Sequence, residues 1–389
     1  MIIGNFFKKL ELKYKKQYFS GLCFDSSKCK KDNIFFAIKG TKTDGNKFIN
    51  HAIKKGAKII ISKQKFEGLK NNILFIKSSN VRKCLSEIAY AIYKDRPRNI
   101  TAVTGTNGKS SVADFYFQIL QLNKKKVASI GTLGIKTQNY IKKISNTTID
   151  SITLSICLNK LKQEKINNVI LEASSHGLKQ NRLDGLRFKT GIFTNLSHDH
   201  LDYHKTFDDY LKSKLYLFEN LLEKNANIIT DIEIPQHIKI RDIALKKKCN
   251  IETISNNNSN LEIISHKYQD GKQLVKIRYN KKIYEFQTRL IGKVQIKNIL
   301  MAMIAATKSS LSFKKIVSTI NNIKPVSGRL EQIGIIKNNS KVILDYAHTP
   351  NALKVTLESL KEQFKNRKIS IVFGCGGDRD KKKRPMMGK

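Results

Sequence analysis

The segment that decides the fold is Thr104-Gly105-Thr106-Asn107-Gly108-Lys109-Ser110-Ser111. It follows an apolar run at residues 100–103 and precedes a stretch in which apolar residues recur at helical spacing, so it joins a predicted strand to a predicted helix. Glycines allow backbone N–H groups to turn toward a phosphate, and a helix N-terminus adds about half a positive charge. Lys109 can then reach the β- and γ-phosphates of a nucleotide, and the Ser110 hydroxyl can ligate Mg²⁺. The segment therefore predicts a phosphate-binding loop, although its glycines are spaced more tightly than in the standard Walker pattern.

Around this loop the sequence divides into three zones, which predict three domains. Residues 1–95 carry short apolar runs separated by turns with glycine and asparagine, and this pattern predicts a small α/β domain. Residues 96–325 alternate predicted strands and helices, as in a βαβ sheet, and later form a predicted antiparallel hairpin. Residues 326–389 hold a strand, a helix after Pro350 and a second strand at residues 369–373, which predict one crossover unit of a third, incomplete sheet. A chain of 389 residues is long enough for two or three such α/β domains.

Polar motifs follow several predicted strands. Glu172 ends an apolar strand, and because ligands of α/β sheets bind at the carboxyl ends of strands, it is a candidate Mg²⁺ ligand, with a helix-capping acid as the alternative. Residues 194–204 contain three histidines and two aspartates within seven positions. They lack a helical His-x-x-x-His with a third distant ligand, so they favour Mg²⁺-nucleotide chemistry over zinc. In the last zone, Asp345 can hold a ribose hydroxyl, and a glycine-rich loop can deliver Arg379 to an anion.

The charge of the chain is strongly positive, since 73 Lys and Arg minus 31 Asp and Glu gives +42. Such a field attracts nucleic acids. The excess is spread over the whole length, however, and aromatic residues make up only 8% with no tryptophan, which argues against a dedicated nucleic-acid surface. A compositional bias toward lysine on solvated faces is the favoured interpretation, and we expect no nucleic-acid partner.

The cysteines and the apolar runs bear on the cellular compartment. Six scattered cysteines form no Cys-x-x-Cys pair and no zinc spacing, so we expect reduced thiols. The N-terminus lacks an apolar core of signal-peptide length, and the longest later apolar run, residues 299–306, is far shorter than a membrane span. We therefore expect a cytoplasmic protein with no membrane partner.

Taken together and in order, the motifs closely resemble those of the Mur ligases. The resemblance covers essentially the whole chain, and the segments that carry it are Phe24-Asp25-Ser26, the Gly-Thr-Asn-Gly-Lys loop, Asn146-Thr147-Thr148, residues 172–178, residues 197–204, Ser327-Gly328-Arg329-Leu330-Glu331, residues 345–351 and Gly376-Gly377-Asp378-Arg379-Asp380. The resemblance implies a first domain that holds a uridine nucleotide, a central P-loop ATPase domain and a Rossmann-like third domain that helps to bind an amino acid.

The resemblance also assigns expected roles to residues. Those expected at the ATP are Gly105, Thr106, Asn107, Gly108, Lys109, Ser110, Asn298, Arg329 and Asp345. Those expected at the UDP-sugar are Ser26, Thr41, Lys42 and Thr43, and at its muramoyl-dipeptide end Asn146, Thr147, Thr148, Ser174, Gln180 and Arg182. Arg379 is expected to clamp a carboxylate of the amino acid.

The implied activity is ATP-dependent formation of an amide bond, with Mg²⁺ as cofactor. The expected catalytic residues are Lys109, Glu172, His200 and Lys214, and the expected metal set is Ser110, Glu172, His200 and Lys214. Lys214 matches the lysine that the family carries as a carbamate, an anion that can hold a second Mg²⁺ where an ammonium would repel it. The γ-phosphoryl group of ATP is expected to activate the D-glutamyl carboxylate of UDP-N-acetylmuramoyl-L-alanyl-D-glutamate as an acyl phosphate, which diaminopimelate then attacks. This reaction belongs to peptidoglycan precursor synthesis, and we expect a monomeric enzyme.

Three departures from the family pattern qualify these expectations. Gln295 stands where the family usually has Asn, and Ile149 replaces a proline; we expect both to be tolerated. The chain ends at Lys389, before the family's Asp-Asn-Pro-Arg motif, as either a fragment of a longer protein or a degraded copy. The alternatives for function are the same ligase acting on L-lysine, a folylpolyglutamate synthase-like ligase, and a basic nucleic-acid-binding protein.

Overall fold

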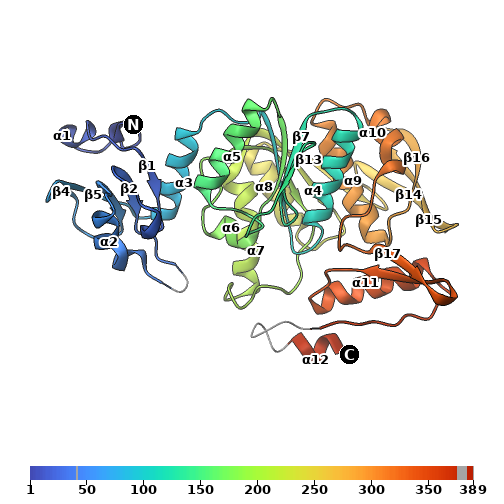
Figure 1. The fold of residues 1–389 in the computed structure, drawn as a ribbon. Coiled ribbons are helices and arrows are strands. Elements are labelled where there is room, and N and C mark those ends of the chain that lie inside the picture. The colour runs from blue at the N-terminus through green and yellow to red at the C-terminus, as the bar shows by residue number, and fades with distance from the viewer. Residues whose placement is uncertain (41–42, 375–382, 389) are drawn as a thin grey trace. The chain divides into compact units, whose positions relative to one another are not determined.

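The computed structural model describes residues 1–40, 43–374 and 383–388, which form two compact units (Figure 1). The first unit comprises Met1–Arg96, Ile149–Lys160 and Gln180–Leu186, so it is assembled from three separate pieces of chain. The second comprises Pro97–Thr148, Leu161–Lys179 and the described residues of Arg187–Lys389. The domain boundaries expected at residues 95 and 325 stay predictions.

The first unit is built on a five-stranded sheet with the order β1-β2-β3-β5-β4. All neighbouring strands are parallel except β4, which runs antiparallel to β5. The bounds are β1 Gly21–Cys23, β2 Asn33–Phe36, β3 Ile59–Ser62, β4 Gly68–Lys70, β5 Ile73–Lys77, α1 Leu12–Lys15, α2 Ile49–Lys54 and α3 Val81–Ile92, with short 3₁₀ turns at Ile3–Asn5, Ser26–Lys28 and Gly45–Phe48.

The apolar runs of the first zone form buried strands, as predicted. In β2, Ile34 and Phe36 join one apolar cluster together with α3, while Phe35 joins another cluster together with α2. Successive side chains of a strand point to opposite faces, so a strand covered on both sides must be apolar at every position.

The second unit contains an eleven-stranded sheet with the order β16-β15-β14-β13-β12-β11-β6-β10-β7-β8-β9. The seven strands from β14 to β7 in this order are parallel to their neighbours. The strand bounds are β6 Asn99–Thr104, β7 Val127–Gly131, β8 Gly134–Lys136, β9 Ile141–Lys142, β10 Asn168–Glu172, β11 Phe188–Phe193, β12 Leu222–Asp231, β13 Asn250–Ser255, β14 Leu261–Gln269, β15 Lys272–Tyr279 and β16 Lys282–Thr288. The antiparallel pair β15–β16 confirms the predicted hairpin.

The remaining helices are α4 Lys109–Leu122, α5 Ser151–Gln163, α6 Ser175–Lys179, α7 Phe207–Tyr216, α8 His237–Lys247, α9 Lys293–Thr307, α10 Phe313–Thr319, α11 Pro350–Gln363 and α12 Lys383–Gly388, with a π-helical turn at Leu217–Leu221 and 3₁₀ turns at Ile320–Asn322 and Lys337–Asn339. Most of α5 belongs to the first unit. The predicted helix after the phosphate-binding loop is α4, which packs beside α9 (Figure 1). Ten of its fourteen residues are buried, so α4 is apolar on more than the one face expected of a surface helix. Among the helices of the described residues, none is long and apolar enough to cross a membrane.

The prediction of a crossover unit in the last zone is wrong for the described residues. The predicted strand at residues 342–344 forms as β18, Ser340–Leu344, but its partner is β17, Glu331–Ile336, which runs antiparallel to it. Residues 369–373 adopt no strand, and Val372 is fully exposed. A partner only a few residues away satisfies the backbone groups of β18 at a much lower cost in loop closure than a parallel crossover would.

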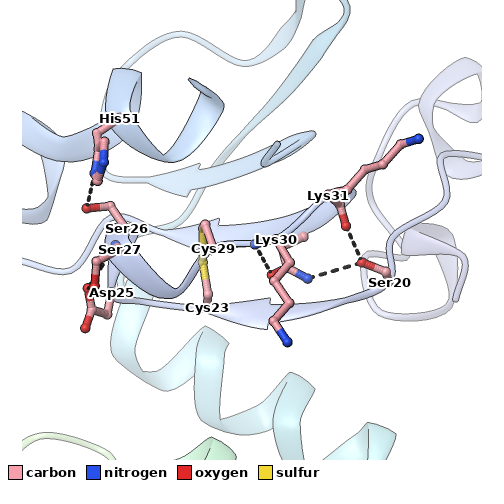
Figure 2. The surroundings of a disulfide bond; sticks show 10 residues. Ser20, Cys23, Asp25, Ser26, Ser27, Cys29, Lys30, Lys31 and His51 are labelled. Carbon is pink, nitrogen blue, oxygen red and sulfur yellow. Dashed lines mark hydrogen bonds between the residues drawn. A yellow bond between two sulfur atoms is a disulfide. The ribbon is translucent and has the colours of Figure 1, made fainter. Parts of the chain in front are cut away.

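The expectation that all six cysteines are reduced is also wrong. Cys23, at the end of β1, forms a disulfide with Cys29, which follows the 3₁₀ turn Ser26–Lys28 (Figure 2). The two Cα atoms lie 5.7 Å apart, within the range that a disulfide requires. The sequence spacing does not match a known motif, and only the turn between the two cysteines brings them together.

Candidate active site

The predicted phosphate-binding loop lies at the carboxyl edge of the parallel strands of the second unit. The Thr194 hydroxyl donates to the carbonyl of Asn107 at 2.6 Å, and the N–H of Thr106 donates to the carbonyl of Asn195 at 2.9 Å. Gly105 has φ of +144°, and a Cβ there would lie 1.9 Å from the Thr194 hydroxyl oxygen. Glycine is therefore required here by both backbone conformation and space. The segment that follows β11 fixes the shape of the loop.

Lys109 begins α4 and folds back over the loop. Its Nζ donates to the carbonyls of Gly105 and Thr106 at 2.9 and 2.8 Å. Burial lowers the pKa of this lysine, and the nearby Arg329 cation lowers it further. The loop carbonyls thus hold the ammonium at the place where the sequence predicts the phosphates.

Ser110 and Glu172 place two oxygen donors beside each other. The Ser110 hydroxyl donates to Glu172 Oε2 at 3.1 Å, and Glu172 is 2% exposed. Thr132, directly after β7, donates its N–H to Glu172 Oε1 at 2.8 Å and lies with its hydroxyl 3.2 Å from Oε2. Strands β6, β10 and β7 are neighbours in the sheet, which explains why three distant segments meet here.

Lys214, on α7, is the most unusual charged residue of the site. It is 1% exposed, its Nζ donates to the carbonyl of Gly105 at 2.7 Å, and the same atom lies 4.5 Å from the ring centroid of Tyr210. Burial holds its pKa well below the ordinary lysine value, and the neighbouring Lys109 acts in the same direction. A neutral amine is the form that reacts with CO₂, so the surroundings favour the expected carbamate chemistry.

His200 lies near the same cluster in a left-handed conformation, with φ of +54°. Burial lowers its pKa, and the positive charges of Lys214 and Lys109 act in the same direction, while Asp199 opposes them. Its Nε2 lies 3.5 Å from Asp199 Oδ2, and the imidazole ring of His176 is 5.0 Å away between centroids. A neutral imidazole is the form that can coordinate a metal ion.

The expected adenosine residues meet at the start of α9. Asn298 Nδ2 donates to Gln295 Oε1 at 3.1 Å, and Gln295 Nε2 donates to the carbonyl of Arg329 at 3.2 Å. The Arg329 guanidinium lies 4.7 Å from the ring centroid of Tyr346. Asp345 Oδ2 accepts the N–H of Leu330 at 2.8 Å, so this carboxylate joins the segment after β18 to the segment before β17.

The residues expected to bind the muramoyl-dipeptide end fall in both units. In the second unit, the Thr148 hydroxyl donates to the carbonyl of Glu172 at 2.7 Å and lies 3.0 Å from the Ser174 hydroxyl. Thr147 Oγ1 lies 3.1 Å from Thr132 Oγ1, while Asn146 is exposed. In the first unit, Arg182 donates to Gln180 Oε1 at 2.8 Å.

The expected uridine-sugar residue Ser26 lies in the first unit, on the turn that the disulfide closes. Its hydroxyl is 2.9 Å from Nδ1 of His51, an exposed side chain on α2, as Figure 2 shows. Asp25 accepts both the N–H and the hydroxyl of Ser27, which shapes the same turn. Thr43 is exposed, and the expected residues Thr41, Lys42 and Arg379 lie outside the described residues.

Several residues of the site were not predicted. Thr132, Tyr210, Asn195 and His51 contact predicted residues, yet none of them has a predicted role, although Asn195 lies within the polar segment 194–204. A usable signal existed only for Thr132 and Asn195, because each directly or closely follows a predicted parallel strand, where ligand-binding residues collect.

The donor set at the loop fits Mg²⁺. A hydroxyl and a carboxylate provide the hard oxygen ligands that this ion prefers, and a carbamate on Lys214 would add two more. Among the described residues, no three His, Cys, Asp or Glu side chains form a group that could hold a metal ion, so the expected set depends on Ser110 and on the modified lysine.

A fully buried histidine next to this site predicts a pH dependence of folding. His204 is 0% exposed, and neither ring nitrogen has a hydrogen-bond partner among the described residues; Asp209 Oδ2 is 3.5 Å from Nδ1. Burial lowers its pKa to about 4. Because the unfolded chain binds this proton at about pH 6.5, the contribution of neutral His204 is complete above pH 6.5 and lost as the pH falls toward 4.

In the wild type, we expect the free energy of unfolding to fall by about 3 kcal/mol between pH 6.5 and pH 4 because His204 becomes protonated, and His204→Phe should remove this fall. Urea unfolding at pH 7.5 and 4.5 measures it. His51→Ala, which changes an exposed histidine, serves as the control and should keep the wild-type pH dependence. An unchanged slope in the Phe variant would show that His204 does not titrate with folding.

Comparison with known proteins places these features in a family. The Mur ligase middle domain model matches residues 103–306, the Mur ligase, glutamate ligase domain model matches residues 328–389, and the Mur ligase family, catalytic domain model matches residues 18–99. The chain is 37% identical to the UDP-N-acetylmuramoyl-L-alanyl-D-glutamate–2,6-diaminopimelate ligase of Rickettsia rickettsii, over 95% of this chain and 77% of that protein.

Solved structures agree with these matches. A structure of UDP-N-acetylmuramoyl-L-alanyl-D-glutamate–2,6-diaminopimelate ligase superposes with a TM-score of 0.80 and 27% identity, covering 100% of this chain and 79% of that one. A folylpolyglutamate synthase of Mycobacterium tuberculosis complexed with ADP and AMPPCP has a TM-score of 0.61 at 13% identity, over 73% of this chain and 71% of that one, a likeness of fold alone. The phosphate-binding loop, the buried Lys214 and these matches together lead to one conclusion: the chain belongs to the Mur ligase family.

Proposed function

We propose that this chain is an ATP-dependent ligase that joins diaminopimelate to UDP-N-acetylmuramoyl-L-alanyl-D-glutamate. The observation that carries the proposal is that Lys109 and Lys214 both donate to the carbonyl of Gly105. A nucleotide site needs one lysine at the phosphates, so the second, buried lysine points to a further chemical role. The names of the relatives supply the acceptor and the amine.

The reaction needs charge neutralisation at the transferring phosphoryl group. The loop N–H groups and Lys109 would bind the phosphates, and the Lys109 ammonium would move from the loop carbonyls to the β- and γ-oxygens. The D-glutamyl carboxylate attacks the γ-phosphorus and ADP leaves; the amine then attacks the acyl phosphate, and inorganic phosphate leaves as the amide forms. Thr148 and Ser174 would orient the dipeptide end near Glu172.

Ser110, Glu172, His200 and the carbamate of Lys214 would hold Mg²⁺. When bound, the ion would supply Lewis-acid neutralisation of phosphate charge. The chain's own contribution is to exclude water from Glu172 and Lys214, which are 2% and 1% exposed, and to lower the pKa of the lysine by burial, which favours the neutral amine that reacts with CO₂.

Phosphate release that requires ATP, the UDP-linked dipeptide and an amine together tests the proposal. Diaminopimelate, L-lysine and glutamate are compared as amines, and a folate is compared as the acceptor. Turnover with the UDP-linked dipeptide and diaminopimelate supports it. Turnover only with L-lysine would show that lysine, and not diaminopimelate, is the amine substrate. Turnover only with folate and glutamate would show that the chain catalyses the folylpolyglutamate reaction.

The proposal also predicts a role for His51 in binding the UDP-sugar. In His51→Ala the Ser26 hydroxyl loses the partner that orients it, so we expect KM for the UDP-linked dipeptide to rise about fivefold with kcat unchanged, as the loss of one hydrogen bond implies. Initial rates at varied UDP-substrate measure this. His237→Ala, on α8 of the second unit, is the control and should leave KM unchanged; an equal effect of both variants would contradict the role of His51.

A further inference from the structure

The first two turns of α9 carry two buried amides that face the same side of the helix. Gln295 is 4% and Asn298 6% exposed, and side chains three residues apart are neighbours on a helix. Asn298 donates to Gln295 Oε1 at 3.1 Å, and Gln295 donates in turn to the carbonyl of Arg329 at 3.2 Å. Gln295 therefore bridges two residues that the resemblance to the Mur ligases assigns to the adenosine.

Asn298 extends this bridge to the phosphate-binding loop. A Cβ on Gly108, which has φ of +85°, would lie only 2.5 Å from Asn298 Oδ1. The amide of Asn298 thus lies directly against the loop at the N-terminus of α4. Its orientation is fixed on one side by the loop and on the other by the oxygen of Gln295.

The helix that carries this bridge is itself clamped. Lys297, between the two amides in sequence, places its Nζ 2.6 Å from Oδ2 of Asp231, the last residue of β12, and 2.6 Å from Oε2 of Glu233, just beyond it. These ion pairs link the start of α9 to the end of β12 and to the segment that follows it. With the backbone held, the length of the side chain at position 295 decides whether Asn298 and Arg329 are linked.

We propose that Gln295 is a positioning residue of the nucleotide site, which holds Asn298 and the Arg329 backbone in register with the phosphate-binding loop; the inference rests on the proposed use of ATP. Its two contacts need an acceptor and a donor at the end of a chain of glutamine length. An asparagine, shorter by one methylene group, can keep the contact with Asn298 but not both contacts.

The test measures the affinity for ADP with Mg²⁺ by calorimetry, using the full chain. Gln295→Met, which keeps the length but removes both hydrogen bonds, is expected to weaken ADP binding about tenfold. Gln295→Asn should fall between Gln295→Met and the wild type. In the full reaction, KM for ATP should rise in the same order while kcat at saturating ATP stays unchanged, which a general loss of folded enzyme would not produce.

The matched control is Gln118→Asn. The Gln118 amide pairs with the backbone of Lys324 at 2.8 and 3.1 Å, so this variant loosens the chain just before Arg329 without touching Asn298. ADP affinity that is equal in the wild type and a folded Gln295→Met variant, or equally weakened in Gln118→Asn, overturns the inference. A wild-type chain without affinity for ADP would instead contradict the proposed function.

Discussion

Lys214→Ala is expected to lower kcat about 10²–10³-fold, the loss typical of removing one preorganised charged group from an active site. The physical reason is that the Lys214 amine is 1% exposed and beside Lys109, where a cation is costly and a carbamate anion would be compensated. Single-turnover phosphate release, measured with all three substrates, separates this loss from weaker binding.

A lysine two residues away provides the matched control. Lys212 is on the same helix but its side chain is 76% exposed and pairs with Asp208 at 2.8 Å, so Lys212→Ala should keep wild-type kcat. Added formate or acetate should partly restore the Lys214→Ala variant if an anion is what the position supplies. If Lys214→Ala kept wild-type kcat without added carboxylate, this would contradict both the role of Lys214 as a metal ligand and its modification to a carbamate.

Gly105→Ala is expected to abolish nucleotide binding, with a loss of affinity greater than about 100-fold. The added Cβ would lie 1.9 Å from the Thr194 hydroxyl oxygen and 3.1 Å from backbone atoms of Asn195, and the φ of +144° disfavours any residue with a side chain. The loop must therefore move away from the segment that shapes it. Calorimetry with ADP and Mg²⁺ measures the effect.

Gly271→Ala is the control that separates the cost of placing alanine at positive φ from the cost of a steric clash. Gly271 also has positive φ, +72°, but an added Cβ would meet nothing within 4 Å among the described residues. This variant should lose about 1 kcal/mol of stability and retain ADP affinity. If both alanine variants bind ADP like the wild type, the loop around Gly105 does not hold the phosphates.

Local pattern was enough to predict several of the parallel strands of the central sheet. Parallel strands covered on both faces are continuous apolar runs, so β6, β7 and β10 could be located from sequence within a residue or two. Because their carboxyl ends share one edge of the sheet, the nearness of Ser110 to Glu172 also followed from the pattern. The pattern does not show which of several apolar strands pair with each other. For this reason the sequence predicts a parallel partner for β18, whereas its partner is the antiparallel strand β17.

The contacts of the site were less predictable than its motifs. Lys214 is one lysine or arginine among 73, and only the fold shows that it is buried against Gly105 and Tyr210. Likewise, the hydrogen bonds that join Gln295 to Asn298 and to the carbonyl of Arg329 follow from no pattern in the sequence. Burial and partners of single polar residues depend on tertiary packing, which no local spacing encodes.

The three-piece construction of the first unit limits how Mur ligase genes can be recombined. The hydroxyls of Ser86 and Tyr90 on α3 donate to the carbonyls of Asn181 and Arg182, which lie more than ninety positions further along the chain. In a chimera that takes only residues 1–96 from a relative, the α3 helix would come from the relative, while the carbonyls of Asn181 and Arg182 would come from this chain. We therefore expect an exchange of this unit between relatives to need residues 149–160 and 180–186 as well, because all three pieces of chain belong to it.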